Sequence, residues 1–312
     1  MIKRVQVSAP GKVILSGEHA VVYGFPAILA AVNRRLTITV EEKNDLEVYS
    51  LAGKDLIQFA VGKAAEMFKV SSRPNFKITI NSQILLGCGM GSSASMAVAL
   101  VGALSQSWGF PWNRRKINDI AYEIEKKQHR YPSGGDNTIA TYGGFLWFRK
   151  ETENFKVFIP IKPKDFPTIL LINSGKPVEN TGEMVAQVRN FFDRDRSRVN
   201  GIFQRMEKIT RFLLEFLEGK DYPLCDLFQE NESLLESLGI VSPKTKRIIQ
   251  EIGRLGGGAK VSGAGGVKIG SGIILAYHKD IDLLENFAKK ENLGYFKVVL
   301  GERGVMIEKK QL

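Results

Sequence analysis

Apolar and polar residues alternate along the first part of the chain, and a period of two predicts β-strands. This pattern covers residues 5–15, 36–40 and 76–80. Between the last two strands, residues 54–68 place apolar side chains at helical spacing, which predicts an amphipathic helix. The N-terminal part of the chain therefore mixes strands with helices.

Residues 93–108 are apolar on nearly every side. A helix of that composition is expected to lie buried at the centre of a domain, between a sheet and other helices. A further helix is predicted over residues 115–128, followed by a turn-rich segment at 131–137 and a strand at 144–148. A buried helix holds its N-terminus rigidly, and this favours a binding role for the loop that precedes residue 93.

Charged and proline-containing residues between 150 and 167 indicate a crossover, so we expect an N-terminal domain of residues 1–165 and a C-terminal domain of residues 166–312. The second half again mixes the two kinds of element. Its predicted strands are residues 168–173, 273–277 and 295–300, and its predicted helices lie within 181–217, 221–238, 243–255 and 280–290. The expected fold class is α+β with antiparallel sheets.

Length and composition fit a globular enzyme, because the chain has 312 residues and 44% of them are hydrophobic. Its two cysteines, Cys88 and Cys225, match no metal-ligand spacing and are too few for a disulfide framework, which favours the reducing cytoplasm. Charged residues interrupt the first apolar run before a signal sequence can form. No apolar stretch is long enough to cross a bilayer, so no membrane association is expected.

The formal net charge of +11 indicates a partner or substrate that carries negative charge: nucleic acid, an anionic surface or anionic substrates. The basic residues are spread along the chain and do not form an arm, and no helix-turn-helix, zinc-finger or RNA-recognition signature accompanies them. Nucleic acid is therefore not an expected partner, which leaves an anionic surface or anionic substrates.

A glycine-rich loop, LLGCGMGSSAS at residues 85–95, is the most informative segment. Glycines let backbone amides approach an anion, and the helix that follows offers unpaired N–H groups and the positive end of its dipole. The spacing is neither that of a Walker loop nor that of a Rossmann loop. Because no lysine lies inside the loop, a bound polyphosphate would need Mg²⁺ and basic groups from elsewhere. An ordinary strand-to-helix turn is the competing interpretation.

Three separated segments together resemble the GHMP kinase superfamily. They are PGKVILSGEHAVVYG at residues 10–24, the loop at 87–95, and KVSGAGG at 260–266. They occur in the order of that family and span nearly the whole chain, and the first segment is similar in particular to the mevalonate kinases. The resemblance implies a ribosomal-protein-S5-like N-terminal half and a ferredoxin-like C-terminal half, with ATP and substrate in the cleft between them.

The activity that the resemblance implies is transfer of the ATP γ-phosphoryl group to the primary hydroxyl of mevalonate, giving 5-phosphomevalonate for isoprenoid synthesis. Asp136 matches the proposed catalytic base and Lys12 the catalytic lysine, while Glu125 with Ser93 or Ser92 matches the Mg²⁺ ligands. The implied substrate-binding residues are Glu18, His19, Ser133 and Thr181, where His19 would contact the substrate oxygens and Glu18 would orient its neighbours. The implied ATP-binding residues are Gly87, Gly89, Gly91, Ser92, Ser93, Ala94, Ser95, Gly263, Ala264 and Gly265.

Each of these residues also has a plain structural interpretation. Lys12 fits an exposed turn lysine, Asp136 a turn residue, and Glu125 a surface charge on a helix. His19 fits a satisfied core histidine, and Thr181 fits the N-cap of the following helix. The joint match and its spacing favour the functional interpretation.

The chain departs from the family pattern at three places. Leu85 replaces the usual proline before the phosphate loop, Val267–Gly272 replaces further glycines, and Arg130 with Tyr131 replaces small residues. Lys268 is a candidate phosphate contact, and Arg130 or Lys176 would suit an acceptor that carries a phosphate. Phosphomevalonate or another small alcohol therefore stays an alternative acceptor, and a non-catalytic basic binding protein a more distant one. The oligomeric state is left open, with a homodimer as one option.

Overall fold

The computed structural model describes residues 4–43, 47–49, 54–70, 75–128 and 132–311. Its first sheet has seven strands, in which β11, β1, β2, β4 and β3 follow one another and β5 joins β2 to β6. The strands are β1 (Arg4–Ser16), β2 (Ala27–Lys43), β3 (Glu47–Tyr49), β4 (Asn75–Ser82), β5 (Phe145–Lys150), β6 (Lys156–Ile161) and β11 (Met306–Gln311).

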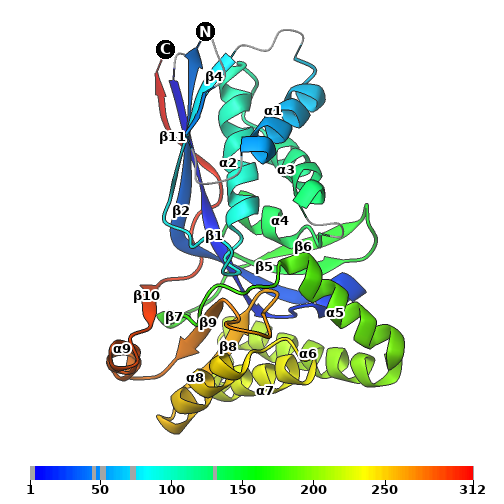
Figure 1. Ribbon diagram of the computed structural model, residues 1–312, viewed down its shortest axis with the longest axis vertical. Helices are drawn as coiled ribbons and strands as arrows, with labels where there is room; N and C mark the ends of the chain where they lie inside the picture. The colour runs from blue at the N-terminus through cyan, green and yellow to red at the C-terminus, as the bar shows by residue number, and fades with distance from the viewer. Residues whose placement is uncertain (1–3, 44–46, 50–53, 71–74, 129–131, 312) are drawn as a thin grey trace.

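Four α-helices and a short 3-10 helix accompany this sheet, and α1 to α4 lie on one side of it in Figure 1. They are η1 (Ala20–Tyr23), α1 (Lys54–Phe68), α2 (Ser92–Ser107), α3 (Arg114–Gln128) and α4 (Gly135–Tyr142). Helix α2 packs against β1, β2 and all of the other three α-helices. Its residues from Ala94 to Gln106 are all buried, which confirms the prediction of a central helix.

A second, antiparallel sheet of four strands has the order β10, β7, β9, β8. Its strands are β7 (Ile169–Asn173), β8 (Gly258–Ser262), β9 (Ile273–Tyr277) and β10 (Gly294–Val298). The helices of this half are α5 (Thr181–Arg194), α6 (Arg196–Leu217), α7 (Leu224–Ser237), α8 (Pro243–Arg254) and α9 (Ile281–Lys290). Helix α6 packs on both α7 and the N-terminal strands β1 and β2, so it joins the two halves.

The expected α+β class is confirmed, and most predicted elements lie within two residues of their observed bounds. Three local predictions are wrong or incomplete. Residues 131–137 were expected to be a turn, but α4 begins at Gly135. The segment expected as a crossover contains β6, and β2 begins nine residues before the strand predicted at residue 36. The first part of β2 pairs with β5, which is distant in sequence, whereas β6 forms a hairpin with the preceding strand β5. Helix α4 packs against α2 and α3.

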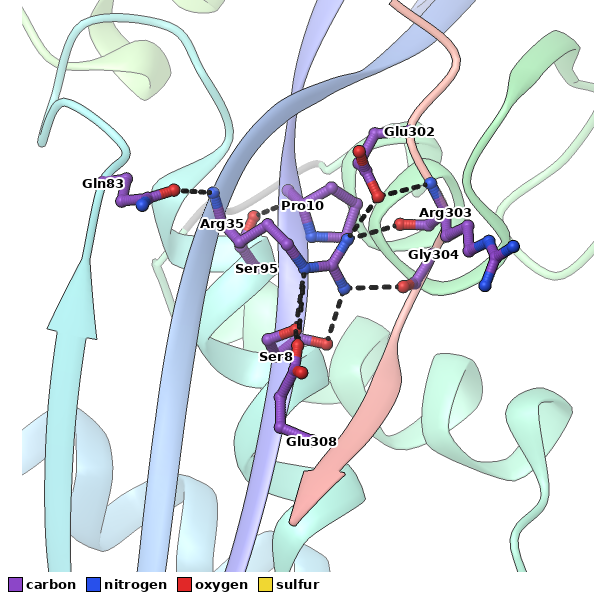
Figure 2. A network of polar contacts seen from close by, with 9 residues as sticks. All are labelled: Ser8, Pro10, Arg35, Gln83, Ser95, Glu302, Arg303, Gly304 and Glu308. Atoms are coloured by element: carbon purple, nitrogen blue, oxygen red, sulfur yellow. Dashed lines mark hydrogen bonds and ion pairs between the residues drawn. The ribbon is translucent and has the colours of Figure 1, made fainter.

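The last strand returns to the first sheet, where β11 pairs antiparallel with β1. Arg35 holds this arrangement from the adjacent strand β2 (Figure 2). Its guanidinium donates to the Ser8 hydroxyl at 2.7 Å, to the Arg303 carbonyl at 2.7 Å and to the Gly304 carbonyl at 2.8 Å. It also pairs with Glu302 at 3.2 Å. The boundary at residue 165 stays a prediction, and this topology assigns residues 306–311 to the sheet of the first half.

Within the described ranges, the helices are all too short or too polar to cross a lipid bilayer.

Candidate active site

Two adjacent cavities lie between the segments that the sequence singled out. One has a volume of about 410 Å³ and is lined by β1, the start of α4 and the side of α5. The other has a volume of about 680 Å³ and is lined by the glycine-rich loop and the start of α2. Both volumes are in the range of small-molecule sites. The residues that line both cavities are Lys12, Glu125, Asp136, Thr181, Gly263 and Ala264.

The glycine-rich loop lines the larger cavity, hereafter the loop cavity, through Gly87, Gly89 and Gly91. All three have positive φ angles, of 71°, 86° and 70°. A Cβ atom on Gly89 would lie 2.7 Å from the Ser262 carbonyl oxygen, and one on Gly91 would lie 2.8 Å from Lys12 Cγ. Glycine is therefore needed both for the turn and for close approach to β8 and to Lys12.

Helix α2 begins directly after Gly91, and its first residues, Ser92, Ser93 and Ala94, also line the loop cavity. The N-terminus of a helix presents backbone N–H groups and a partial positive charge, which together favour a bound anion. Ser95 was predicted to bind ATP, but it does not line the cavity. Its hydroxyl donates to the Pro10 carbonyl at 2.7 Å, so it fixes the helix to β1 (Figure 2).

Lys12 and Asp136 meet at the junction of the cavities. The Lys12 side chain is 5% exposed, and its Nζ atom lies 3.3 Å from Asp136 Oδ2. Asp136 lies in the first turn of α4, where the helix dipole favours a negative charge. The interpretation of Lys12 as an exposed turn residue is therefore wrong. The ion pair holds the two side chains in a fixed relation to each other at the junction of the cavities.

Glu125, near the end of α3, comes within hydrogen-bond reach of α2, where the Ser93 hydroxyl donates to its carboxylate. Glu125 is 4% exposed, so it is not a surface charge. Burial, together with the smaller effect of the Asp136 charge, raises the pKa of Glu125 to about 7, while the Ser93 hydrogen bond and the Lys12 charge oppose this rise. The group therefore exchanges its proton near neutral pH, and a cation at this position would favour the ionised form.

His19 lines the smaller cavity, hereafter the acceptor cavity, and its backbone has a positive φ of 59°. Its Nε2 atom lies 3.0 Å from the Ala264 carbonyl oxygen, and because a carbonyl only accepts, the ring carries its proton on Nε2. Burial lowers the pKa of His19 to about 4, so the ring is neutral. Its buried Nδ1 atom has no hydrogen-bond partner among the described residues.

Glu18 was predicted to bind substrate, but it lines neither cavity. Its side chain is 0% exposed and is paired with the equally buried Lys260 of β8. Glu18 therefore does not belong to the lining of the substrate site, because its carboxylate is already paired with a counter-ion, and its expected role of orienting its neighbours stays a prediction.

Thr181 lines both cavities, as the resemblance implies. It is not the N-cap of α5, because Asn180 takes that position in a capping box with Glu183. Ser133 also lines the acceptor cavity, and its hydroxyl accepts from the Gly135 amide at 3.1 Å at the start of α4.

Sequence reasoning missed the contribution of α5 to the acceptor cavity. Gly182, Val185, Ala186 and Arg189 line it. Within the described part of the chain, Arg189 and Lys12 are the only arginine or lysine residues in its lining. The helical spacing of residues 182, 185, 186 and 189 was the available signal, because these positions share one face of a helix.

The C-terminal glycine-rich segment closes the site from the other half. Residues 258–262 form β8, and the loop begins at Gly263. Gly263 and Ala264 line both cavities, and Gly265 lines the loop cavity. Lys176, considered above as an acceptor contact, instead lines the loop cavity, and Lys268 is exposed and lines neither. Arg130 and Tyr131 lie outside the described residues.

Comparisons with known proteins agree with this arrangement. Residues 55–144 match the GHMP kinases N terminal domain. The chain is 34% identical to the mevalonate kinase of Archaeoglobus fulgidus over 268 residues, covering 83% of this chain and 88% of that protein. It is 31% identical to the mevalonate kinase of Methanocaldococcus jannaschii, covering 91% and 96%. Its fold is similar to that of L. major mevalonate kinase in complex with R-mevalonate, with a TM-score of 0.82, 26% identity and 95% of each chain covered.

Proposed function

The chain belongs to the mevalonate kinase family of the GHMP kinases, and we propose that it transfers the γ-phosphoryl group of ATP to the primary hydroxyl of mevalonate, giving 5-phosphomevalonate. One observation carries this proposal. A cavity lined by an anion-binding loop meets a second, smaller cavity at Lys12, Glu125 and Asp136. A phosphoryl donor in the first and an alcohol in the second would face each other across these three side chains.

In the proposed reaction, the hydroxyl oxygen of the acceptor forms a bond to the γ-phosphorus while the bond from that phosphorus to the β–γ bridging oxygen breaks. Asp136 accepts the hydroxyl proton, and ADP leaves with the bridging oxygen. Because such transfer is largely dissociative, Asp136 contributes mainly by orienting the hydroxyl. The Lys12 ammonium, 3.3 Å from Asp136, holds that carboxylate in place and offsets charge on the transferred group.

ATP use follows from the family, and we propose Mg²⁺ as its companion ion. Among the described residues no three histidine, cysteine or carboxylate side chains form a protein-only metal site. A hydroxyl and a carboxylate, from Ser93 and Glu125, do lie together at the loop cavity. This pair suits Mg²⁺, which keeps water and phosphate oxygens as most of its ligands. When bound, the ion would neutralise phosphate charge.

Recognition of the acceptor is proposed for the smaller cavity. Arg189 on α5 lines this cavity and not the loop cavity, so it fits the carboxylate of mevalonate at the end remote from the reacting hydroxyl. His19, Ser133 and Thr181 are proposed to contact the acceptor hydroxyls. The unpartnered Nδ1 atom of His19 supports this, since a hydroxyl would satisfy it.

A phosphorylated acceptor is the second candidate, because Arg189 would also suit a phosphate. Lys176 argues against it, since it lines the loop cavity and so fits the phosphates of ATP. We place the reaction in the cytoplasm, as the two unpaired thiols Cys88 and Cys225 suggest.

The direct test measures ADP release from Mg-ATP with mevalonate, 5-phosphomevalonate, homoserine, galactose or no acceptor, with phosphorus NMR of the product. Turnover on mevalonate with phosphate on the primary hydroxyl is expected, and Asp136→Asn should abolish it. If only another acceptor is phosphorylated, the assignment of the ATP site stands and the assignment of mevalonate as acceptor is wrong. No turnover on any acceptor, with nucleotide still bound, would favour a non-catalytic binding protein.

A further inference from the structure

A buried ion pair crosses between the two halves beneath the acceptor cavity. The Glu18 carboxylate, just after β1, is paired with the Lys260 ammonium on β8, and both side chains are 0% exposed. Lys260 Nζ also donates to the carbonyl oxygens of Ile14 at 3.1 Å and Val261 at 2.7 Å. The ammonium thereby uses all three of its donors.

The carboxylate side of the pair is held as firmly. Glu18 Oε1 accepts from Lys260, and Glu18 Oε2 accepts from Asn231 Nδ2 at 3.4 Å. The Asn231 amide is held in turn by the Ser16 hydroxyl at 2.8 Å. A buried charge without a partner is costly, so neither member can leave the other without a large penalty.

Two more hydrogen bonds join the same two segments, residues 14–19 and 260–264. The Ile14 amide donates to the Ser262 hydroxyl at 2.9 Å, and His19 Nε2 donates to the Ala264 carbonyl at 3.0 Å. His19 directly follows Glu18 and has a positive φ of 59°, which a residue with a side chain rarely adopts unless its surroundings impose it. Ala264 in turn lines both cavities.

We propose that Glu18 and Lys260 are positioning residues, which hold His19 in its positive-φ conformation and the Gly263–Ala264 wall at the junction of the two cavities. They act through these neighbours, since Glu18 and Lys260 themselves line neither cavity. This inference rests on the proposed function, because the wall matters only if donor and acceptor meet there. Loss of the pair displaces the wall, and a displacement of about 1 Å can lower turnover by about 100-fold.

The test uses the double variant Glu18→Gln/Lys260→Met, which removes both charges of the pair. The neighbouring carboxyl of Glu232 adds no charge near neutral pH, because burial raises its pKa to about 8. Replacement of a buried pair by neutral side chains is often tolerated in folding. We expect a melting temperature close to that of the wild type, a kcat lower by about tenfold to 100-fold, and a KM for ATP within about threefold. The matched control is Glu236→Gln/Lys246→Met, which removes a partly exposed pair whose members line neither cavity, and it should behave like the wild type.

A second readout follows His19 by ¹⁵N NMR of its ring, which is practical because the chain has only three histidines. The wild type should show a proton on Nε2 and none on Nδ1, and the double variant should lose this single tautomer. Wild-type turnover in the double variant would overturn the inference, as would reduced turnover with an unchanged His19 spectrum. If the double variant does not fold, the variant Glu18→Asp tests the inference instead, because it keeps the charge on a side chain that is shorter by one methylene. Turnover and the His19 spectrum are then measured in the same way.

These experiments test the proposed function and the role of the Glu18–Lys260 pair separately. If the wild type does not phosphorylate mevalonate, the proposed function fails, whereas the His19 spectrum still reports whether the ion pair fixes the wall.

Discussion

The ammonium of Lys12 lies 3.3 Å from the carboxylate of Asp136, at the junction of the two cavities. The two residues come from different elements, since Lys12 is on β1 and Asp136 is in the first turn of α4. Their contact places a cation and a proton acceptor together where a phosphoryl donor would meet an alcohol.

Replacement of Asp136 by asparagine keeps the shape of the side chain and removes its charge. We expect kcat to fall by about 100-fold or more, as for loss of a general base, with little change in KM for ATP. Steady-state assays with mevalonate would measure this. The control Asp221→Asn alters an exposed aspartate that lines neither cavity. Near-normal turnover of Asp136→Asn would remove the base assignment and leave only a role in orienting the hydroxyl.

Glu125 should make the stability of the metal-free protein depend on pH. Its folded-state pKa of about 7 lies above the usual value of 4.5, so the folded protein binds the proton more tightly than the unfolded chain does. The stabilising contribution is therefore complete below pH 4.5 and is lost as the pH rises to about 7. Thermal unfolding in EDTA should show this loss, and Glu125→Gln should remove it, whereas the exposed control Glu218→Gln should not.

Mg²⁺ should reverse that dependence, because the cation requires the ionised carboxylate. The stabilisation by Mg-ADP should grow as the pH rises through about 7, and this growth should be absent in Glu125→Gln. An unchanged Mg²⁺ requirement for turnover in that variant would contradict the metal assignment.

Arg189→Met should weaken binding of an acceptor that carries a carboxylate. We expect KM for mevalonate to rise by about tenfold or more, as for loss of a charge-assisted hydrogen bond, with KM for ATP nearly unchanged. A second acceptor, the alcohol that corresponds to mevalonate without its carboxylate, distinguishes loss of a carboxylate contact from a general loss of acceptor binding. Arg189→Met should not weaken the binding of this alcohol further. Arg194→Met, on the same helix and away from both cavities, is the control. Equal losses on both acceptors would contradict a carboxylate contact.

Two glycine substitutions should have opposite effects on stability. Gly89→Ala would place a Cβ 2.7 Å from the Ser262 carbonyl at a φ of 86°, so we expect a lower free energy of unfolding and a raised KM for ATP. Gly62→Ala lies within α1 with nothing within 4 Å of the new Cβ, and it should raise the free energy of unfolding by about 0.5–1 kcal/mol. Urea denaturation would measure both. A stable, fully active Gly89→Ala variant would show that the loop does not need glycine there.

The elements with a strong periodic or apolar pattern were predictable from sequence, and those whose residues favour a turn or loop were not. Helix α2 was recognisable from its unbroken apolar run. Helix α4 was not, because Gly134, Gly135 and Asp136 favour a turn. Packing against α2, α3 and β1 and the Asn137–Asn118 bond, 2.7 Å long, stabilise it as a helix.

Some residues of the candidate site were also identifiable from sequence, and others were not. Lys12, Glu125 and Asp136 were identified through the resemblance, and the structure brings them together. The misassigned Glu18 lies in the same motif as His19, and only the position of Lys260, on a strand from the other half, shows that the carboxylate is already paired. Arg189 was missed because a single arginine on an amphipathic helix carries no local signal of what that helix face contacts.

The pairing of Arg4 with Gln311 brings together the two ends of the described chain and gives folding a fixed order. While the protein is being synthesised, β1 has β2 beside it, but its other edge stays unpaired until β11 has left the ribosome. An unpaired edge is a template for strands of other molecules. Docking of β11 therefore covers this edge of β1, and Arg35 holds the segment that leads into the strand through the carbonyls of Arg303 and Gly304.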